Sequence, residues 1–299
     1  MIDLIEMMRP LNCVMACIGV LVGGLIVTGS NIQVLFSTPF ILAVISVFLI
    51  TGAGNMFNDY VDVEADKINA PHRPIPSGKI SKNTAFVFSI GLFVTGVFFT
   101  AFINWVCFLI ALFNTFLLII YSLILQDKVL VGNLAVGYLT GSLFLFGGAA
   151  LGDITLPSVL FLLATLTTIT REIVKDLEDM EGDRRSFLKK IVTKFTSSIA
   201  ERFKITTDGV KMKYRERTMV TLAISSLILA VMFSILPYYY GILGIGYLVI
   251  VLVADVIFVS CMYSLGKEMG NRKGYHRISR RLKIGMFVAL IAFIAGVLI

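Results

Sequence analysis

The sequence predicts an all-α, polytopic membrane protein with about nine transmembrane helices. Of the 299 residues, 57% are hydrophobic and only 15% are charged, whereas an average soluble domain has about 25% charged residues. The apolar residues also gather into long runs, and about 20 such residues are needed for a helix to cross a bilayer. An ordinary soluble enzyme is therefore not expected. The expected organisation is a single membrane-embedded domain over residues 1–299.

Nine apolar runs are long enough to span a membrane. They cover residues 10–29, 36–54, 84–104, 106–125, 132–151, 156–175, 218–236, 239–264 and 282–299. The third and fourth runs meet at a very short connection around Asn104 and should form an antiparallel hairpin. Glycines recur in the first and fifth runs, where small residues would let helices pack closely. These are Gly19, Gly23, Gly24, Gly141, Gly147 and Gly148.

The charged residues predict which way the helices face. All 26 Lys and Arg residues lie before the first run or around the connections that follow the even-numbered runs. Because basic connections stay on the cytoplasmic side, we expect the N-terminus and these connections in the cytoplasm and the C-terminus outside. Of the 19 acidic residues, all but Asp153 and Asp255 share that side. One membrane face should therefore carry nearly all the polar chemistry.

Two of these cytoplasmic connections, residues 55–83 and 171–217, contain acidic clusters with the same spacing. Each has three aspartates separated by three and then four residues: Asp59, Asp62 and Asp66 in the first, Asp176, Asp179 and Asp183 in the second. On a helix, this spacing places three carboxylates on one face. Basic residues follow both clusters, and prolines stiffen the loop that carries Arg73 and Lys79.

Carboxylates that share a face repel one another unless a cation lies between them. Mg²⁺ is typically held by a few carboxylates together with water and substrate phosphates, and Arg and Lys bind the remaining phosphate oxygens. The two clusters therefore predict a site for a Mg²⁺–diphosphate substrate. A solvated loop of mixed charge is the alternative for either cluster alone, but the matched spacing of the two argues against it.

At these residues the chain resembles the UbiA superfamily of intramembrane prenyltransferases. The family pattern N-D-x-x-D-x-x-x-D matches residues 58–66, and its R-P-x-x-S-G loop matches residues 73–78. The second aspartate motif of the family, after the sixth helix, matches residues 176–183. Residues 9–12 and the stretch 121–134 also resemble family landmarks, and the family has nine helices. The resemblance implies a UbiA-type bundle with an active-site cap on its cytoplasmic side.

The resemblance also implies prenyl transfer from an allylic diphosphate, with Mg²⁺ as cofactor. The residues expected to bind metal are Asp62, Asp66, Asp176 and Asp183, with Asp179 as a further catalytic residue. The residues expected to bind substrate are Asn12, Asn58, Arg73, Lys79, Tyr121, Lys128, Arg171 and Lys175. Where the family often has a lysine five residues after Tyr121, this chain has Gln126, and Lys128 is expected to reach the diphosphate instead. We expect an aspartate of either cluster to be the base that deprotonates the acceptor hydroxyl.

Residues 171–183 and 278–287 most resemble an archaeal branch of the superfamily. This resemblance implies geranylgeranyl transfer from its diphosphate to geranylgeranylglyceryl phosphate, which forms the second ether bond of archaeal membrane lipids. The expected partners are the prenyl diphosphate donor, the lipid-phosphate acceptor and membrane lipids, with no nucleic acid or protein partner. One alternative is an aromatic acceptor, as in quinone synthesis. A transporter is a weaker one, because transporters place charged sites near the membrane midplane.

Two further features have more than one interpretation. Within residues 184–217, apolar residues fall near one helical face with basic residues interspersed, which is typical of a basic amphipathic helix in the membrane interface. Such a helix could attract a phosphorylated acceptor, cover the active site or bind anionic lipids. Asp255 lies inside a membrane-spanning run, where it could join two helices by a hydrogen bond or line a polar pocket.

Overall fold

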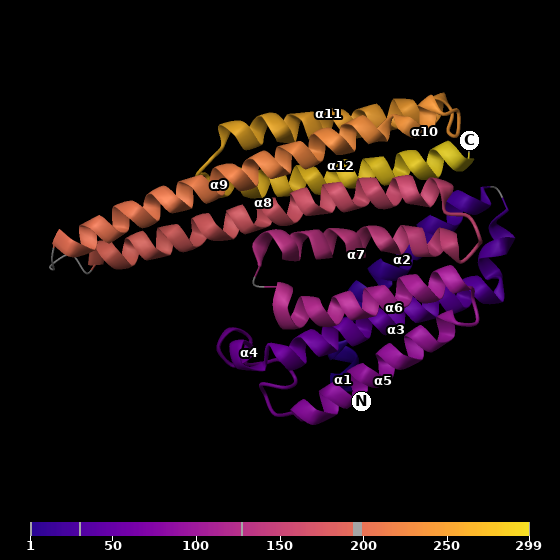
Figure 1. Ribbon diagram of the computed structural model, residues 1–299, viewed down its shortest axis with the longest axis horizontal. Coiled ribbons are helices and arrows are strands. Elements are labelled where there is room, and N and C mark those ends of the chain that lie inside the picture. Colours follow the sequence, from indigo (N-terminus) through magenta and orange to yellow (C-terminus); the bar gives the residue numbers. More distant parts are fainter. Residues whose placement is uncertain (1, 30, 127, 194–198, 299) are drawn as a thin grey trace. The chain divides into compact units, whose positions relative to one another are not determined.

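A computed structural model describes residues 2–29, 31–126, 128–193 and 199–298, with only the backbone described for residues 129, 181–193, 199–214 and 298. The described chain consists of helices and connections, with no strand among these residues. It divides into two compact units, residues 1–165 and 166–297 (Figure 1). The single domain expected from the sequence over residues 1–299 stays a prediction.

The first unit contains most of the helices. They are α1 (Ile2–Met7), α2 (Pro10–Thr28), the 3₁₀ turn η1 (Ile32–Phe36), α3 (Thr38–Val61), α4 (Val63–Asn69), α5 (Lys82–Thr100), α6 (Trp105–Ile120), the π-helical turn η2 (Tyr121–Leu125), α7 (Val129–Ala149) and the start of α8 (Thr155–Thr193). The second unit contains the rest of α8, then α9 (Ile199–Ser234), α10 (Leu236–Tyr239), α11 (Ile245–Lys267) and α12 (Arg272–Leu298).

Eight helical stretches of the described chain are long and apolar enough to cross a membrane, and each overlaps one of the first eight predicted runs. They are Pro10–Thr28, Thr38–Val61, Lys82–Thr100, Trp105–Leu125, Leu130–Ala149, Thr155–Met180, Arg215–Tyr239 and Ile245–Lys267. The ninth predicted run, 282–299, falls within α12 but is not among these eight. The prediction of a helical, multi-pass membrane protein is confirmed, whereas the number nine is not.

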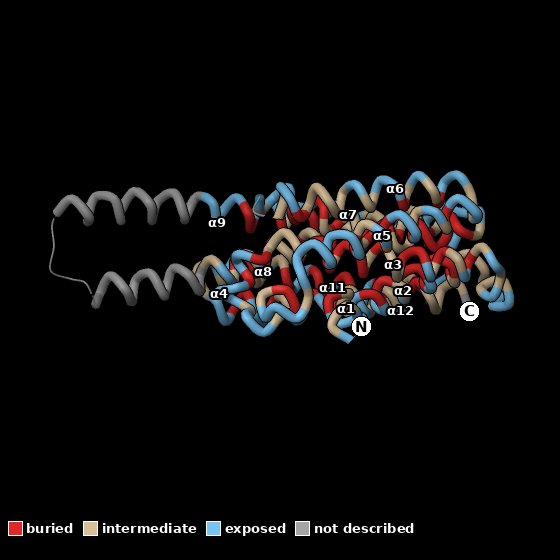
Figure 2. Tube along the Cα trace, turned by 90° about the horizontal axis from the view of Figure 1, so that it is seen from below, coloured by how far each residue is buried: buried red, intermediate tan, exposed pale blue. Residues whose placement is uncertain are grey.

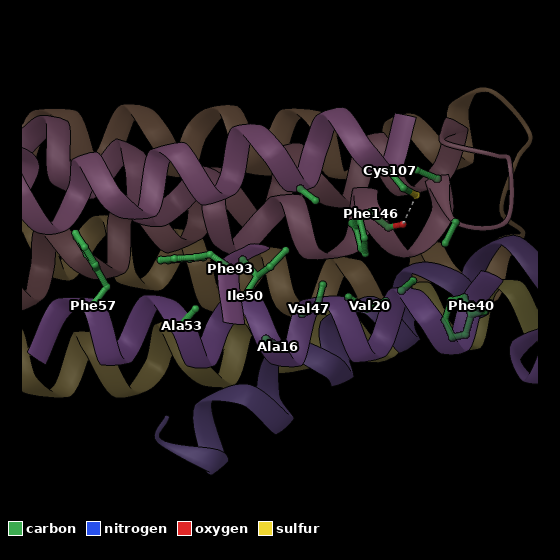
Figure 3. Close-up of a cluster of buried hydrophobic side chains, with 14 residues drawn as sticks. Ala16, Val20, Phe40, Val47, Ile50, Ala53, Phe57, Phe93, Cys107 and Phe146 are labelled. Carbon is green, nitrogen blue, oxygen red and sulfur yellow. Dashed lines mark hydrogen bonds between the residues drawn. The ribbon is translucent and has the colours of Figure 1, made fainter. Parts of the chain in front are cut away.

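The core of the first unit forms where α2, α3, α5, α6 and α7 pack together (Figure 3). Its buried side chains include Phe40, Ile50 and Phe146, from α3 and α7. Figure 2 shows exposed turns along these helices. Many of the exposed residues are large and apolar, among them Leu109 and Phe113 of α6, as expected for helices that meet lipid.

Glycines bring α2 and α7 unusually close together. A Cβ atom on Gly23 would lie 2.1 Å from the Phe144 carbonyl oxygen, and one on Gly147 would lie 2.1 Å from the Val20 carbonyl oxygen. No side chain fits in so little space, so the two helix backbones touch at these glycines. The close packing predicted from the glycine pattern is confirmed here.

The predicted hairpin at Asn104 is also present. The Asn104 side chain accepts a hydrogen bond from the Cys107 backbone N–H at 2.9 Å, which caps the start of α6. Its amide nitrogen donates to the Ala149 carbonyl at 2.8 Å. The tight connection between α5 and α6 is thereby fixed to the end of α7.

A second, smaller cluster of buried side chains anchors the loop between α4 and α5. Met7 of α1, Met56 of α3, Val63 of α4 and Ala85 of α5 surround Ile75 of the loop. Within the loop, the Ser77 N–H donates to the Arg73 carbonyl at 3.0 Å. Gly78 has φ +78°, a left-handed conformation that favours glycine. Apolar packing and loop hydrogen bonds together fix the position of Arg73.

Candidate active site

Asp59 lies at the end of α3 and is the meeting point of two arginines. Its side chain is 7% exposed, and its Oδ1 atom is 2.5 Å from Nη2 of Arg9 and 3.4 Å from Nη1 of Arg73. Arg9 precedes α2 with φ +51°, a left-handed conformation that is uncommon for residues other than glycine. A buried carboxylate is costly without such partners, so this pairing explains how Asp59 can be buried.

Asp66, on α4, shares Arg73 with Asp59. Its Oδ2 atom is 2.5 Å from Nη1 of Arg73, and the residue is buried. One guanidinium nitrogen therefore joins two carboxylates whose residues are seven apart in the sequence. The first and third aspartates of the cluster lie together, as their spacing indicates.

Asp62, the middle aspartate, has a different partner. Its Oδ1 atom accepts a hydrogen bond from Nε2 of Gln126 at 2.6 Å. Oε1 of the same glutamine accepts from Nδ2 of Asn58 at 2.8 Å. Asp62 stands between α3 and α4, where its ψ of 6° departs from the helical value of about −42°. The first cluster therefore does not lie on one uninterrupted helix.

Two other charged residues near this cluster have partners of their own. Lys79 Nζ lies 3.6 Å from Asp3 Oδ1, and its side chain is about half exposed. Glu64 pairs with Lys67 at 2.8 Å, and this hydrogen bond lowers the pKa of the Glu64 carboxyl below its usual value. The described partner of Lys79, Asp3, belongs to α1. The expected role of Lys79 in substrate binding stays a prediction.

The remaining predicted residues of the first unit are spread over three elements. Asn12, on α2, and Lys128, just before α7, are exposed, whereas Tyr121 is partly buried at the start of η2. The roles of these three side chains in substrate binding stay predictions.

In the second unit, α8 carries the second acidic cluster on continuous helix. Because α8 runs unbroken from Thr155 to Thr193, the spacing places Asp176, Asp179 and Asp183 on one helical face. Asp176 is partly buried and Asp179 exposed, while the side chain of Asp183 lies outside the described residues. The same is true of most of the predicted basic amphipathic segment, 184–217, whose side chains are described only from residue 215 onward.

Two basic residues precede Asp176 of this second cluster, whereas the bases expected after it, Arg184 and Arg185, have side chains outside the described residues. Arg171 pairs with Glu172, and Lys175 Nζ lies 3.8 Å from the other oxygen of that carboxylate. Glu178 pairs with His276 of α12 at 3.1 Å. Glu172 and Glu178 thus meet nearby basic groups, and Asp176 lies between them in the sequence.

The donor set of the first cluster suits Mg²⁺ bound together with a diphosphate. Where side chains are described, no three His, Cys, Asp or Glu residues gather into a ready metal cage. Mg²⁺ seldom needs one, because it usually takes one or two carboxylates along with water and substrate phosphates. Asp62 offers a carboxylate whose described partner is a neutral amide, and Asn58 offers an amide oxygen. These oxygen donors fit the ion.

The structure adds two residues that were not expected at the site. Arg9 binds Asp59, and Gln126 joins Asn58 to Asp62. The signal for Arg9 was its position as the one base before the first membrane-spanning run. For Gln126 the signal was its place five residues after Tyr121, where the resemblance to the UbiA superfamily leads one to expect a lysine.

Comparison with known proteins gives a consistent result. The model of the UbiA prenyltransferase family matches residues 16–291. Proteins named digeranylgeranylglyceryl phosphate synthase from Methanosarcina mazei and Methanococcoides burtonii are 42% and 44% identical to this chain. The match covers 98% of this chain in both cases, with 97% of the first relative and 98% of the second.

Solved structures agree with these matches. A structure described as that of digeranylgeranylglyceryl phosphate synthase in membranes has a TM-score of 0.83 and 36% identity, covering 99% of this chain and 97% of that one. A UbiA homologue from Archaeoglobus fulgidus bound to GPP and Mg²⁺ has a TM-score of 0.59 at 15% identity, covering 96% of this chain and 99% of that one. The second similarity shows a shared fold.

Proposed function

This chain belongs to the UbiA prenyltransferase family, and from that premise we propose that it transfers a geranylgeranyl group from geranylgeranyl diphosphate to geranylgeranylglyceryl phosphate. The product would carry the second ether bond of an archaeal membrane lipid. Relatives named for this synthase cover the chain almost completely, which favours the lipid acceptor over an aromatic one. The same relatives argue against a transporter.

The observation that carries the proposal is the arrangement of charge at the end of α3. Arg73 joins Asp59 and Asp66, while Asp62 is held by an uncharged amide. Acids and bases therefore stand side by side where a diphosphate and its metal ion need both. The cluster lies at the end of a membrane-spanning helix, so an apolar prenyl chain could extend into lipid while its diphosphate stays at the polar face.

The chemical step breaks the bond between C1 of the prenyl chain and the diphosphate oxygen, which keeps the electron pair. A new bond then forms between C1 and the acceptor hydroxyl oxygen, and the hydroxyl proton leaves. Positive groups around the leaving diphosphate stabilise the charge that develops on it. Both described contacts of Arg73 use Nη1, and a guanidinium has further N–H donors on Nε and Nη2 for phosphate oxygens.

We assign the other roles on the same basis. Asp62 and Asp66 in the first unit, and Asp176 and Asp183 in the second, would hold Mg²⁺, which when bound neutralises charge on the diphosphate as a Lewis acid. Asn58, Lys128, Arg171 and Lys175 would orient the substrates. An aspartate of either cluster would take the proton of the acceptor hydroxyl.

The proposed orientation places the N-terminus and both acidic clusters in the cytoplasm and the C-terminus outside. It rests on the distribution of all 26 basic residues and, for the C-terminus, on the ninth apolar run within α12 also crossing the membrane. A reporter that is active only in the cytoplasm, fused to either end of the chain, tests it. Activity of the C-terminal fusion would contradict the orientation.

A direct assay tests the reaction itself. Purified protein in lipid nanodiscs would receive Mg²⁺, labelled geranylgeranyl diphosphate, and either geranylgeranylglyceryl phosphate or 4-hydroxybenzoate. Labelling of the lipid acceptor is the expected result. Labelling of 4-hydroxybenzoate alone would overturn the lipid assignment, and transfer to neither acceptor would overturn the proposed reaction.

A further inference from the structure

We infer that Gln126 is a positioning residue that holds Asp62 for the metal ion while leaving its negative charge intact. The inference rests on the proposed function, since it concerns the Mg²⁺ that prenyl transfer requires. Three observations support it: the hydrogen bonds of the Gln126 side chain, the π-helical turn that presents it, and the contrast between Asp62 and its two neighbouring aspartates.

Both ends of the Gln126 amide are engaged. Nε2 donates to Asp62 Oδ1 at 2.6 Å, and Oε1 accepts from Asn58 Nδ2 at 2.8 Å. Chemistry fixes this orientation of the amide, because an ionised carboxylate only accepts hydrogen bonds and the amide nitrogen is the donor. If the amide turned over, its oxygen would face the Asp62 carboxylate. The side chain thus fastens two motif residues four apart in the sequence, Asn58 near the end of α3 and Asp62 directly after it.

The backbone before Gln126 is shaped to present it. The Gln126 N–H donates to the carbonyl of Tyr121, five residues earlier, at 3.0 Å, rather than to the residue four earlier as in an α-helix. A π-helical turn of this kind adds one residue to the turn and changes which side chains face a neighbouring helix. Such turns are rare and occur frequently at functional sites.

Gly132 of α7 leaves room for this turn. A Cβ atom on Gly132 would lie 2.8 Å from the Leu125 carbonyl oxygen, closer than real Cβ contacts come. The last residue of η2 therefore approaches α7 where a glycine allows it. The position of Gln126 is thus supported both by its own side-chain bonds and by the packing of the turn before it.

Asp62 differs from its neighbours in the charge of its partner. Asp59 and Asp66 are paired with arginines, whose positive charges offset their own. Asp62 is bound by an amide, which orients the carboxylate without neutralising it. A lysine at position 126 would place a positive charge there and compete with a cation. Gln126 therefore orients the Asp62 carboxylate by a hydrogen bond, and the negative charge of that carboxylate stays available to attract Mg²⁺.

The backbone of Asp62 is already fixed, so the side chain is what remains to be oriented. The Asp62 N–H donates to the Asn58 carbonyl at 2.9 Å, and the Asp62 carbonyl accepts from the Asp66 N–H at 2.8 Å. Loss of the Gln126 amide would free rotation about the side-chain bonds alone. We therefore expect weaker metal binding with little change in the fold.

The test uses Mn²⁺ as a spectroscopic substitute for Mg²⁺. Full-length protein in nanodiscs would be titrated with Mn²⁺ and followed by EPR, with and without the unreactive analogue geranylgeranyl thiolodiphosphate. Two variants are compared with wild type: Gln126→Met, which keeps length but loses both hydrogen bonds, and Gln126→Lys, which adds a charge. Groups that orient metal ligands typically contribute about 10- to 100-fold to metal affinity.

We expect Gln126→Met to weaken Mn²⁺ binding about tenfold and Gln126→Lys to weaken it more, within the range for such groups. In the transfer assay, both variants should need more Mg²⁺ for half-maximal rate, and high Mg²⁺ should restore much of that rate. Asn114→Leu is the matched control. It removes a side-chain amide of α6, the helix before η2, that donates to Ser142 at 2.9 Å, and it should leave the titration unchanged.

The outcomes separate this inference from the proposed reaction. Wild-type Mn²⁺ affinity in both Gln126 variants would overturn the positioning role, whatever the enzyme transfers. Weakened affinity in both Gln126 variants and in Asn114→Leu would also overturn it, because the effect would then be a general loss of structure. Absence of transfer by wild-type protein, together with weaker Mn²⁺ binding in the Gln126 variants only, would overturn the proposed reaction and leave the positioning role in place.

Discussion

Nη1 of Arg73 lies 2.5 Å from Asp66 Oδ2 and 3.4 Å from Asp59 Oδ1, so one guanidinium joins the first and last aspartates of the cluster at the end of α3. Asp59 also binds Arg9, from a segment 50 residues earlier. The cluster is thus a network of alternating charges rather than a group of free acids. Loss of one member therefore leaves a partner without its opposite charge or hydrogen bond.

Replacing Asp62 should remove most of the activity. Asp62→Ala deletes the carboxylate that Gln126 holds, so we expect the rate of transfer to fall by about 100-fold or more, as when a group that stabilises developing charge is lost. Glu64→Ala is the control, since this exposed neighbour pairs only with Lys67 among described residues. Near-normal transfer by Asp62→Ala would contradict the assigned role.

The second cluster can be tested in the same assay. Asp176→Ala should also reduce transfer by about 100-fold or more if it holds Mg²⁺ at the diphosphate. Glu178→Gln, on the same helix, is the comparison, because Glu178 pairs with His276 and has no assigned catalytic role. Full activity of Asp176→Ala would mean that the first cluster suffices for the metal.

Arg73→Lys should show that a positive charge alone does not bind the diphosphate as tightly as a guanidinium does. Lysine has no planar fork of donors with which to hold two carboxylates and a phosphate together. We expect the KM for geranylgeranyl diphosphate to rise about tenfold, the loss of roughly one charged hydrogen bond. Lys67→Ala removes a nearby exposed base and should leave KM unchanged; an equal rise there would point to a general charge effect.

Asp255 should matter for stability rather than catalysis. It is 5% exposed within α11, its Oδ2 accepts from Ser234 of α9 at 2.8 Å, and its Oδ1 has no partner among the described residues. Asp255→Asn keeps the acceptor and should retain both activity and thermal stability. Asp255→Leu removes this bond between α11 and α9, while the Ser234 hydroxyl keeps the Val231 carbonyl at 2.8 Å as an acceptor. The free energy of unfolding should therefore fall by about 0.5–1.5 kcal/mol, the net contribution of one hydrogen bond. Loss of activity in a stable Asp255→Asn protein would instead indicate a catalytic role.

The contact between α2 and α7 predicts a strong effect of one added methyl group. Gly23→Ala forces a carbon toward the Phe144 carbonyl, 2.1 Å away, so the helices must separate. Overpacking of this kind costs about 1–3 kcal/mol, which should appear as a lower melting temperature in detergent. Gly91→Ala, in a membrane-spanning helix with nothing within 4 Å of its added Cβ, should melt like wild type or higher.

Local patterns allowed much of the fold to be predicted. Hydropathy located eight of the membrane-spanning helices because a bilayer requires long apolar runs, and the glycines of α2 and α7 indicated that helices could pack closely there. The spacing of Asp59 and Asp66 placed them together because helical periodicity acts over a few residues. The break at Asp62 and the π-helical turn before Gln126 were not predicted, since they depend on packing that a short window of sequence does not contain.

By itself, the sequence determined that the chain is a helical membrane protein and that its aspartates and basic residues gather in two connections suited to a diphosphate. Only the tertiary structure decided which acid meets which partner. Arg9 reaches Asp59, and Gln126 reaches Asp62 across 64 residues. The reason is physical: periodicity fixes neighbours on one helix, whereas contacts between helices depend on how closely they pack and on the exact turn that ends each one.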